Sequence, residues 1–147
     1  MKSIISICIT LFFTFVCACE RVEENYLSEN VEYAAAQYDL LIEKLGKNGK
    51  PWAPRTVDTK GNIVYAHNVW DWTSGFFAGS LWYLYNLTGD EKWKTLAKKY
   101  TETLKQQQYI TSHHDVGFII GCSYLNGMRM GQEAYDTIIV QAAKSLS

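Results

Sequence analysis

The chain repeats itself with a period of 42 residues, and this repeat restricts the folds open to it more than any other feature. Gly75-Phe76 aligns with Gly117-Phe118 at this shift without a gap. The same shift aligns Gly79 with Gly121, Gly89 with Gly131, Glu91 with Glu133 and Trp93 with Tyr135. Self-similarity at a fixed period indicates a repeated supersecondary unit that buries its apolar face against its neighbours. The sequence therefore predicts an array of similar units.

Each repeat unit contains two apolar patterns, and both are helical. The first, GFFAGSLWYLYNL or GFIIGCSYL, is hydrophobic nearly all round, as in a buried helix. The second has apolar residues on one side at steps of three and four, which predicts a half-buried helix. These one-sided stripes are Trp93, Leu96, Ala97, Tyr100 and Leu104, then Tyr135, Ile138, Ile139, Ala142 and Leu146, with an earlier copy at Val31, Ala34, Ala35, Tyr38 and Ile42. No strand-like alternation is evident, so we predict an all-α fold.

Alternating buried and half-buried helices suit an α/α toroid, in which inner helices line a barrel and outer helices cover it. A closed ring of about six hairpins needs roughly 300 residues or more at this period. The chain has 147 residues. A short solenoid is the alternative, although solenoids usually carry distinct terminal caps. The sequence thus predicts an incomplete (α/α)6 toroid, with less than half of the barrel present in an N-terminal fragment.

The first residues form a separate segment. Lys2 is followed by the apolar run SIISICITLFFTFVCAC, which has the form of a signal peptide and is short for a membrane-spanning helix. The run ends in Val16-Cys17-Ala18-Cys19, which resembles a bacterial lipobox; an ordinary signal peptide is the alternative. We therefore predict a lipoprotein signal over residues 1–18, lipidation of Cys19, a polar tether over 19–29 and the barrel domain over 30–147. The expected location is the bacterial cell envelope, with membrane contact only through the lipid anchor.

Charge and metal-ligand spacing exclude two classes of function. The formal net charge is −1 and the basic residues are scattered, so nothing indicates a nucleic-acid partner. No HxH, HExxH or CxxC spacing occurs, so no metal site is predicted. Cys122 lies in an apolar run and is expected to be a small core residue.

The loops before the two inner helices carry the candidate site. At the 42-residue shift Trp72 aligns with His114 and Thr73 with Asp115, so both loops should meet at one end of the barrel. Aromatic rings and a carboxylate together are typical of a sugar-binding site. For Asp115 the alternative is an N-cap, a role worth about 1 kcal/mol.

Other polar residues near these loops have simpler interpretations. Asp71 is an equally good candidate to cap the first inner helix, and His113 and His67 are expected to face solvent. Arg55 and Arg129 are able in principle to bind a carboxylate or sulfate, but Arg129 stands at a helix end, where cations are favoured in any case.

The motifs DWTSGF and HDVGF, within WDWTSGFFAGSLWYLYNLTGDEKW and HDVGFIIGCSYLNG, resemble the N-terminal part of the unsaturated glucuronyl hydrolases, glycoside hydrolase family 88. The resemblance extends over roughly residues 30–147. Unsaturated rhamnogalacturonyl hydrolases share the helical toroid and part of the Gly-Phe pattern, and they remain an alternative.

This resemblance implies an (α/α)6 barrel that needs no cofactor and acts on unsaturated uronic-acid disaccharides or oligosaccharides left by polysaccharide lyases. An acid protonates the C4=C5 vinyl ether of the terminal sugar, water adds at C5, and the hemiketal opens. Asp115 matches the first of two catalytic aspartates, and Trp72 and His114 match substrate-binding positions. The second aspartate of the family falls beyond Ser147, so the chain alone is expected to be an inactive fragment. A non-catalytic glycan-binding lipoprotein that uses Trp72 and Asp115 is the rival hypothesis.

Overall fold

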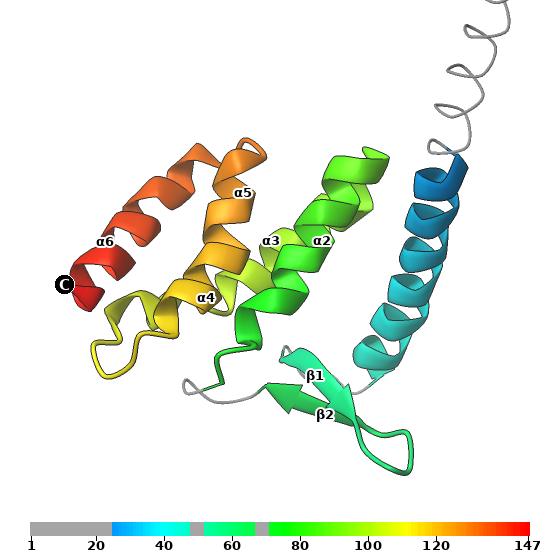
Figure 1. Ribbon diagram of the computed structural model, residues 1–147, viewed down its shortest axis with the longest axis horizontal. Helices are drawn as coiled ribbons and strands as arrows, with labels where there is room; N and C mark the ends of the chain where they lie inside the picture. Colours follow the sequence, from blue (N-terminus) through cyan, green and yellow to red (C-terminus); the bar gives the residue numbers. More distant parts are fainter. Residues whose placement is uncertain (1–24, 48–51, 67–70) are drawn as a thin grey trace, which may run out of the picture. The chain divides into compact units, whose positions relative to one another are not determined.

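The computed structural model describes residues 25–47, 52–66 and 71–147, and it divides into two compact units between residues 47 and 48 (Figure 1). In the first unit, residues 25–47 are helical, and the predicted stripe Val31, Ala34, Ala35, Tyr38 and Ile42 is its less exposed side. The helix includes residues 25–29, so the last part of the predicted tether over 19–29 is helical. NYLSEN contains no helix breaker, and Asn30 Nδ2 donates to the Tyr26 carbonyl oxygen at 2.6 Å.

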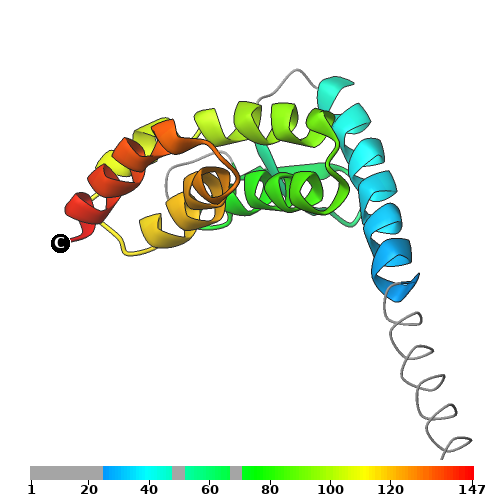
Figure 2. The same ribbon diagram turned by 90° about the horizontal axis from the view of Figure 1, so that it is seen from above.

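The second unit contains two helical hairpins that repeat the same order of elements. An inner helix, α2 (Ser74–Thr88), is followed by an outer helix, α3 (Glu91–Glu102). After the 3₁₀ turn η1 (Lys105–Tyr109), the second inner helix runs without a break through α4 (Val116–Ile120), the π-helical η2 (Gly121–Leu125) and α5 (Asn126–Arg129). The second outer helix comprises η3 (Glu133–Tyr135) and α6 (Asp136–Leu146). Figure 2 shows the inner and outer helices as two layers, as the repeat predicts.

The turns between inner and outer helices repeat as well. Gly89 and Gly131, 42 residues apart, have φ angles of +69° and +88°. A side chain is disfavoured in this left-handed conformation, so glycine is the residue that ends such a helix most readily. The repeat in the sequence therefore corresponds to a repeat in backbone conformation.

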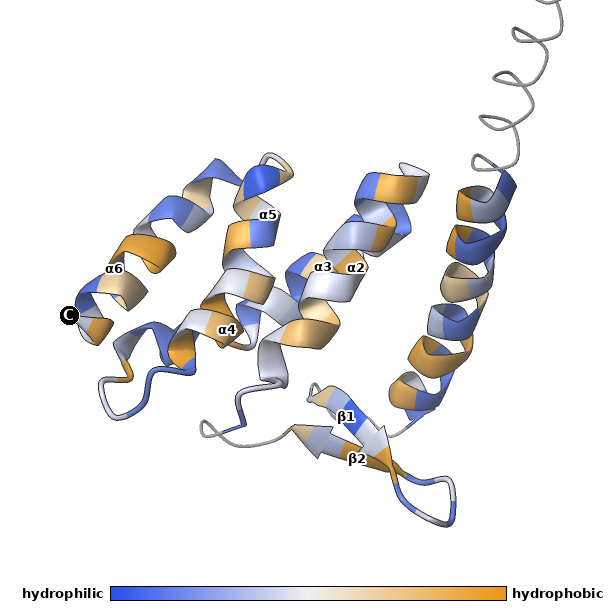
Figure 3. Cartoon of the chain, viewed as in Figure 1, coloured by the Kyte–Doolittle hydropathy of each residue, from blue (hydrophilic) through white to orange (hydrophobic). Residues whose placement is uncertain are grey.

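The core lies between the two layers. Its largest fully buried side chains are Trp82, Trp93, Tyr124, Leu81 and Ile119. The outer helices are amphipathic, and Figure 3 shows polar and apolar residues alternating along α6. Trp82, in the middle of the inner helix α2, is therefore a packing residue.

The two inner helices touch through glycine. A Cβ atom added at Gly75 would lie 2.3 Å from the carbonyl oxygen of Ile119, and one at Gly79 would lie 2.6 Å from that of Cys122. Both distances are shorter than any side chain tolerates, so these glycines let α2 approach the backbone of α4 and η2.

The inner helices are not buried all round, contrary to the sequence-based expectation. Phe76, Tyr83 and Leu87 on α2 and Phe118 on α4 are exposed. The apolar pattern identifies surfaces suited to burial, but no described element of the second unit covers these side chains.

The prediction of an all-α fold misses one hairpin. Strands β1 (Ala53–Val57) and β2 (Ile63–Ala66) pair antiparallel, with Ala53 opposite Ala66 and Val57 opposite Ile63. The Asp58 carboxylate closes the turn by accepting from the backbone N–H groups of Lys60 and Asn62, each at 2.8 Å. These strands are too short for a period of two to be evident, and β1 gains further support by packing on α2.

In the described part of the chain, no helix combines the length and hydrophobicity needed to cross a bilayer.

Candidate active site

The loops that precede α2 and α4 lie together, as the repeat predicts. The Trp72 ring contacts Phe76 at 5.4 Å and Phe118 at 5.9 Å between ring centroids, both edge-on. Phe118 comes three residues after Asp115, so Trp72 and Asp115 belong to the same end of the inner helices. Trp72, Phe76 and Phe118, here called the aromatic cluster, are each 39–50% exposed. They form an apolar surface beside a carboxylate.

The Asp115 side chain does not cap α4. Its backbone angles, φ −66° and ψ −11°, are helical, and its carboxylate makes no capping hydrogen bond. An N-cap residue typically has extended angles that direct its side chain back to the first free N–H groups. Here the Asp115 carbonyl oxygen accepts from Phe118 N at 2.9 Å and Ile119 N at 3.1 Å. The carboxylate oxygens are therefore not occupied by the helix, and the N-cap alternative is wrong.

Two histidines flank this carboxylate. His114 Nε2 lies 3.3 Å from one Asp115 oxygen, and His113 Nδ1 lies 3.9 Å from the other. The His114 side chain is 89% exposed, whereas that of His113 is only 13% exposed. The expectation that His113 faces solvent is thus wrong, because surrounding residues cover most of its imidazole. His67 lies outside the described residues.

Asp71 does not cap the first inner helix, contrary to the alternative that the sequence offered. The N-cap position of α2 is Thr73, and the Asp71 carboxylate bonds to Thr73, outside the helix. The Asp71 side chain is 6% exposed, and Oδ1 accepts from Thr73 N at 3.1 Å and Thr73 Oγ1 at 2.5 Å. Its Oδ2 lies 3.3 Å from Arg55 Nη1. Arg55 is therefore bound to a carboxylate of the protein, and Arg129 Nη1 contacts Asn126 Oδ1 at 3.5 Å.

Neither a reactive thiol nor a metal site is found near these loops among the described residues. Cys122 is partly buried, and burial raises the pKa of its thiol, which keeps it protonated and unreactive. No group of three or more His, Cys, Asp or Glu side chains is placed to hold a metal ion within the described ranges. The predicted lipidation site, Cys19, lies outside them.

Sequence reasoning missed two residues of the aromatic cluster. Phe76 and Phe118 stand at equivalent positions of the repeat, directly after Gly75 and Gly117. Their equivalence is visible in the sequence, but the apolar pattern of an inner helix predicts that both are core residues. One signal in the sequence points to both residues. Each inner helix has an aromatic residue near its start, directly after a loop that carries a candidate site residue.

Known proteins similar to this chain are glycoside hydrolases. The unsaturated glucuronyl hydrolase of Formosa agariphila is 28% identical over 156 residues, covering 99% of this chain and 38% of that protein. The unsaturated chondroitin disaccharide hydrolase of Streptococcus agalactiae is 29% identical over 96 residues, covering 63% of this chain and 23% of that protein. The crystal structure of an unsaturated glucuronyl hydrolase specific for heparin matches with a TM-score of 0.62 and 39% identity, over 65% of this chain and 26% of that chain.

These matches have two consequences. The predicted fold class is confirmed: apart from the β1–β2 hairpin, the described residues of the second unit form part of an α/α toroid. The chain spans well under half the length of the relatives that it matches. A family model described as glycosyl hydrolase family 76 matches residues 29–146. The sequence motifs had indicated family 88 instead. The chain belongs to glycosyl hydrolase family 76.

Proposed function

We propose that this chain supplies one carboxylate and part of the sugar-binding surface of a hydrolase that acts on unsaturated uronyl saccharides, of the unsaturated glucuronyl hydrolase type assigned to family 88. The observation that carries the proposal is the Asp115 carboxylate, which makes no capping bond and lies 3.3 Å from His114. The exposed aromatic cluster lies beside it. Relatives named for unsaturated glucuronyl and unsaturated chondroitin substrates support the same substrate class.

The proposed reaction is hydration of the C4=C5 vinyl ether in the terminal unsaturated glucuronic acid. An acid protonates the double bond, water adds at C5, and the hemiketal opens to release the neighbouring sugar. Asp115 accepts a hydrogen bond from a sugar hydroxyl and supports a second carboxylate that performs the proton transfer. In this proposal the second carboxylate comes from outside the 147 residues.

The aromatic cluster and His114 orient the sugar. The apolar face of a pyranose ring packs well on an aromatic ring, and Trp72 keeps 43% of its surface exposed for such a contact. The exposed imidazole of His114 offers a further donor or acceptor next to Asp115.

The test of this proposal is Asp115→Asn. The reaction is measured in a protein with a complete barrel, for example a chimaera in which residues 30–147 replace the matching part of the heparin-specific relative. Asparagine keeps the shape but not the charge, and no capping bond is lost, so we expect a near-native melting temperature. We expect the rate to fall by about 100-fold or more, followed by the loss of ultraviolet absorbance of the unsaturated disaccharide.

The controls separate the rival hypotheses. Asp90→Asn, at the N-cap of α3, should leave the rate unchanged. The 147-residue chain alone should show no turnover. Full activity of the Asp115→Asn chimaera would contradict the role of Asp115. Saccharide binding by a chimaera that never turns over would favour the glycan-binding lipoprotein, and cleavage only of unsaturated rhamnogalacturonyl products would favour the neighbouring enzyme class.

We also propose that the mature protein is lipid-anchored in the bacterial cell envelope through Cys19. The support is the run Val16-Cys17-Ala18-Cys19 directly after an apolar segment. Cys19→Ala should abolish incorporation of labelled fatty acid and release the protein into the soluble fraction. A wild-type protein that incorporates no lipid and fractionates like the variant would refute the anchor.

A further inference from the structure

We infer that Arg55 and Asp71 are positioning residues that hold Trp72 in the sugar-binding surface. The role assigned to Trp72 rests on the proposed function, whereas the positioning itself rests on contacts in the structure. Asp71 precedes Trp72 directly, and Thr73 follows it. The ion pair of Asp71 with Arg55 links this turn to strand β1.

The buried Asp71 carboxylate closes the turn that carries Trp72. One oxygen accepts from both the backbone N–H and the hydroxyl of Thr73, so the residues on either side of Trp72 are bonded to each other. The other oxygen takes the guanidinium of Arg55 at 3.3 Å. Burying a carboxylate is costly unless it is paired and hydrogen-bonded. These donors come from Thr73 and Arg55. The carboxylate therefore keeps its hydrogen bonds and its ion pair only while the turn at Trp72 stays next to strand β1.

The Trp72 ring is only partly buried. It is 43% exposed, and it meets Phe76 and Phe118 edge-on. The position of such a half-exposed ring depends in part on the backbone that carries it. Loosening the Asp71 turn should therefore move the indole ring and leave the Asp115 carboxylate, on the other loop, in place.

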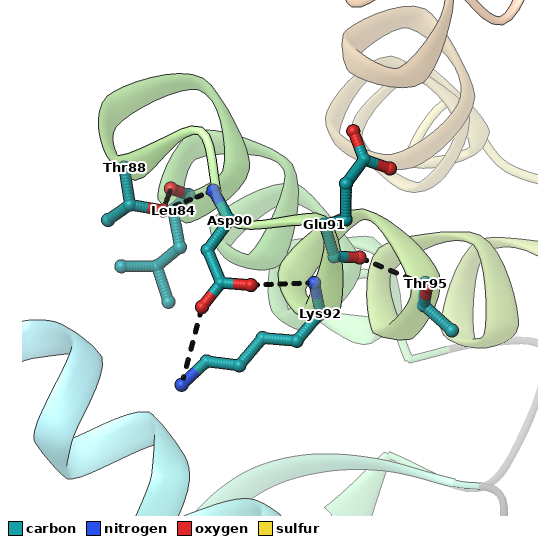
Figure 4. Close-up of polar contacts among 6 residues, drawn as sticks. All are labelled: Leu84, Thr88, Asp90, Glu91, Lys92 and Thr95. Atoms are coloured by element: carbon teal, nitrogen blue, oxygen red, sulfur yellow. Dashed lines mark hydrogen bonds and ion pairs between the residues drawn. The ribbon is translucent and has the colours of Figure 1, made fainter.

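Asp90 offers a matched control within the same chain. It also precedes a helix, accepts from a backbone N–H two residues on (Lys92 N, 2.9 Å) and lies near a cation (Lys92 Nζ, 3.7 Å), as Figure 4 shows. It stands after the C-terminal end of α2, whereas Asp71 stands before its N-terminal end. Asp90→Asn therefore removes a similar set of contacts away from the aromatic cluster.

The experiment is fluorine NMR of the chain labelled with 5-fluorotryptophan. The Trp72 resonance is assigned by its disappearance in Trp72→Phe. We expect Asp71→Asn and Arg55→Gln to shift or broaden this resonance and to leave that of the core residue Trp82 in place. Arg55→Lys keeps the cation and should largely restore the resonance, and Asp90→Asn should not move it. Thermal unfolding of each variant reports whether it is folded.

A saccharide titration extends the test to function. With unsaturated chondroitin disaccharide as the probe, displacement of the ring should raise the apparent Kd between about tenfold and 100-fold in Arg55→Gln. Trp72→Ala should raise it at least as much.

The outcomes distinguish the positioning role of Arg55 and Asp71 from the saccharide-binding role of Trp72. An unmoved Trp72 resonance in a folded Arg55→Gln variant would overturn the positioning role even if Asp71→Asn unfolds. Lower melting temperatures alone, equal in Asp71→Asn and Asp90→Asn, would overturn it as well. A moved resonance with no effect of Trp72→Ala on the disaccharide would uphold the positioning and refute the binding role of Trp72.

Discussion

At the scale of single residues, a buried hydrogen bond links the side chains of an inner and an outer helix in the core. Trp82 is fully buried, and its indole Nε1 donates to Thr101 Oγ1 at 3.0 Å. Thr101 is itself fully buried on the outer helix α3. A buried donor that loses its acceptor pays the cost of leaving water without compensation.

Thr101→Val is therefore expected to lower the free energy of unfolding by about 1–3 kcal/mol, measured by urea denaturation. Valine has nearly the same shape, so the loss isolates the hydrogen bond. Thr95→Val on the same helix is the control, because Thr95 is exposed and its hydroxyl donates to the Glu91 carbonyl oxygen of its own helix. Its effect should stay within about 0.5 kcal/mol. Equal effects of the two substitutions would show that the indole bond contributes nothing.

At the scale of elements, the two inner helices use equivalent glycines differently. Gly75 on α2 lies against the backbone of Ile119, where a Cβ would meet the carbonyl oxygen at 2.3 Å. Gly117, its repeat equivalent on α4, has no atom within 4 Å of the same position among the described residues. Packing against Ile119 therefore requires glycine at position 75. The described residues impose no such requirement at position 117.

Gly75→Ala should force α2 and α4 apart and cost about 1–3 kcal/mol of unfolding free energy or more. Gly117→Ala should instead stabilise the chain by about 0.5–1 kcal/mol, since alanine is the better helix former. Chemical denaturation of the two variants side by side measures the difference. A loss of similar size in Gly117→Ala would mean that this face is covered.

At the scale of the whole second unit, two buried tyrosines connect the hairpins. Tyr124 of η2 and Tyr135 of η3 stack edge-on at 4.7 Å, and Tyr135 also contacts Trp82 of α2 at 6.5 Å. Burial raises the pKa of both hydroxyls well above the usual value. The folded chain therefore holds these protons at a pH at which the unfolded chain releases them.

Stability should accordingly be complete below pH about 10, the ordinary tyrosine pKa, and should fall as pH rises above it. The double variant Tyr124→Phe/Tyr135→Phe should lose less stability over this alkaline range. Denaturation at a series of pH values, followed by circular dichroism, measures the effect. Tyr109→Phe, at a site exposed to solvent, should follow the parent chain. An alkaline loss that is the same in the double variant would assign it to other groups.

The candidate site was only partly predictable from the sequence. The repeat placed Trp72 and Asp115 before equivalent helices, and their loops do lie together. The choice between cap and free carboxylate for Asp115 depended on its backbone angles, which are helical rather than extended. Residue type does not determine those angles, because aspartate is common in both conformations. The exposure of Phe76 and Phe118 was unpredictable for a related reason: an apolar pattern shows that a surface can be buried, not that something covers it.

The sequence by itself determined the helices, their order and the glycine turns at Gly89 and Gly131, because periodicity and left-handed backbone angles act within a few residues. Tertiary structure alone decided the rest. The β1–β2 hairpin depends on the Asp58 turn and on packing against α2, and the Arg55–Asp71 pair joins residues 16 positions apart. Gly75 and Gly117 occupy the same place in the repeat, yet only Gly75 meets a neighbouring backbone. Contacts between distant segments depend on what lies opposite each face, and no local pattern contains that information.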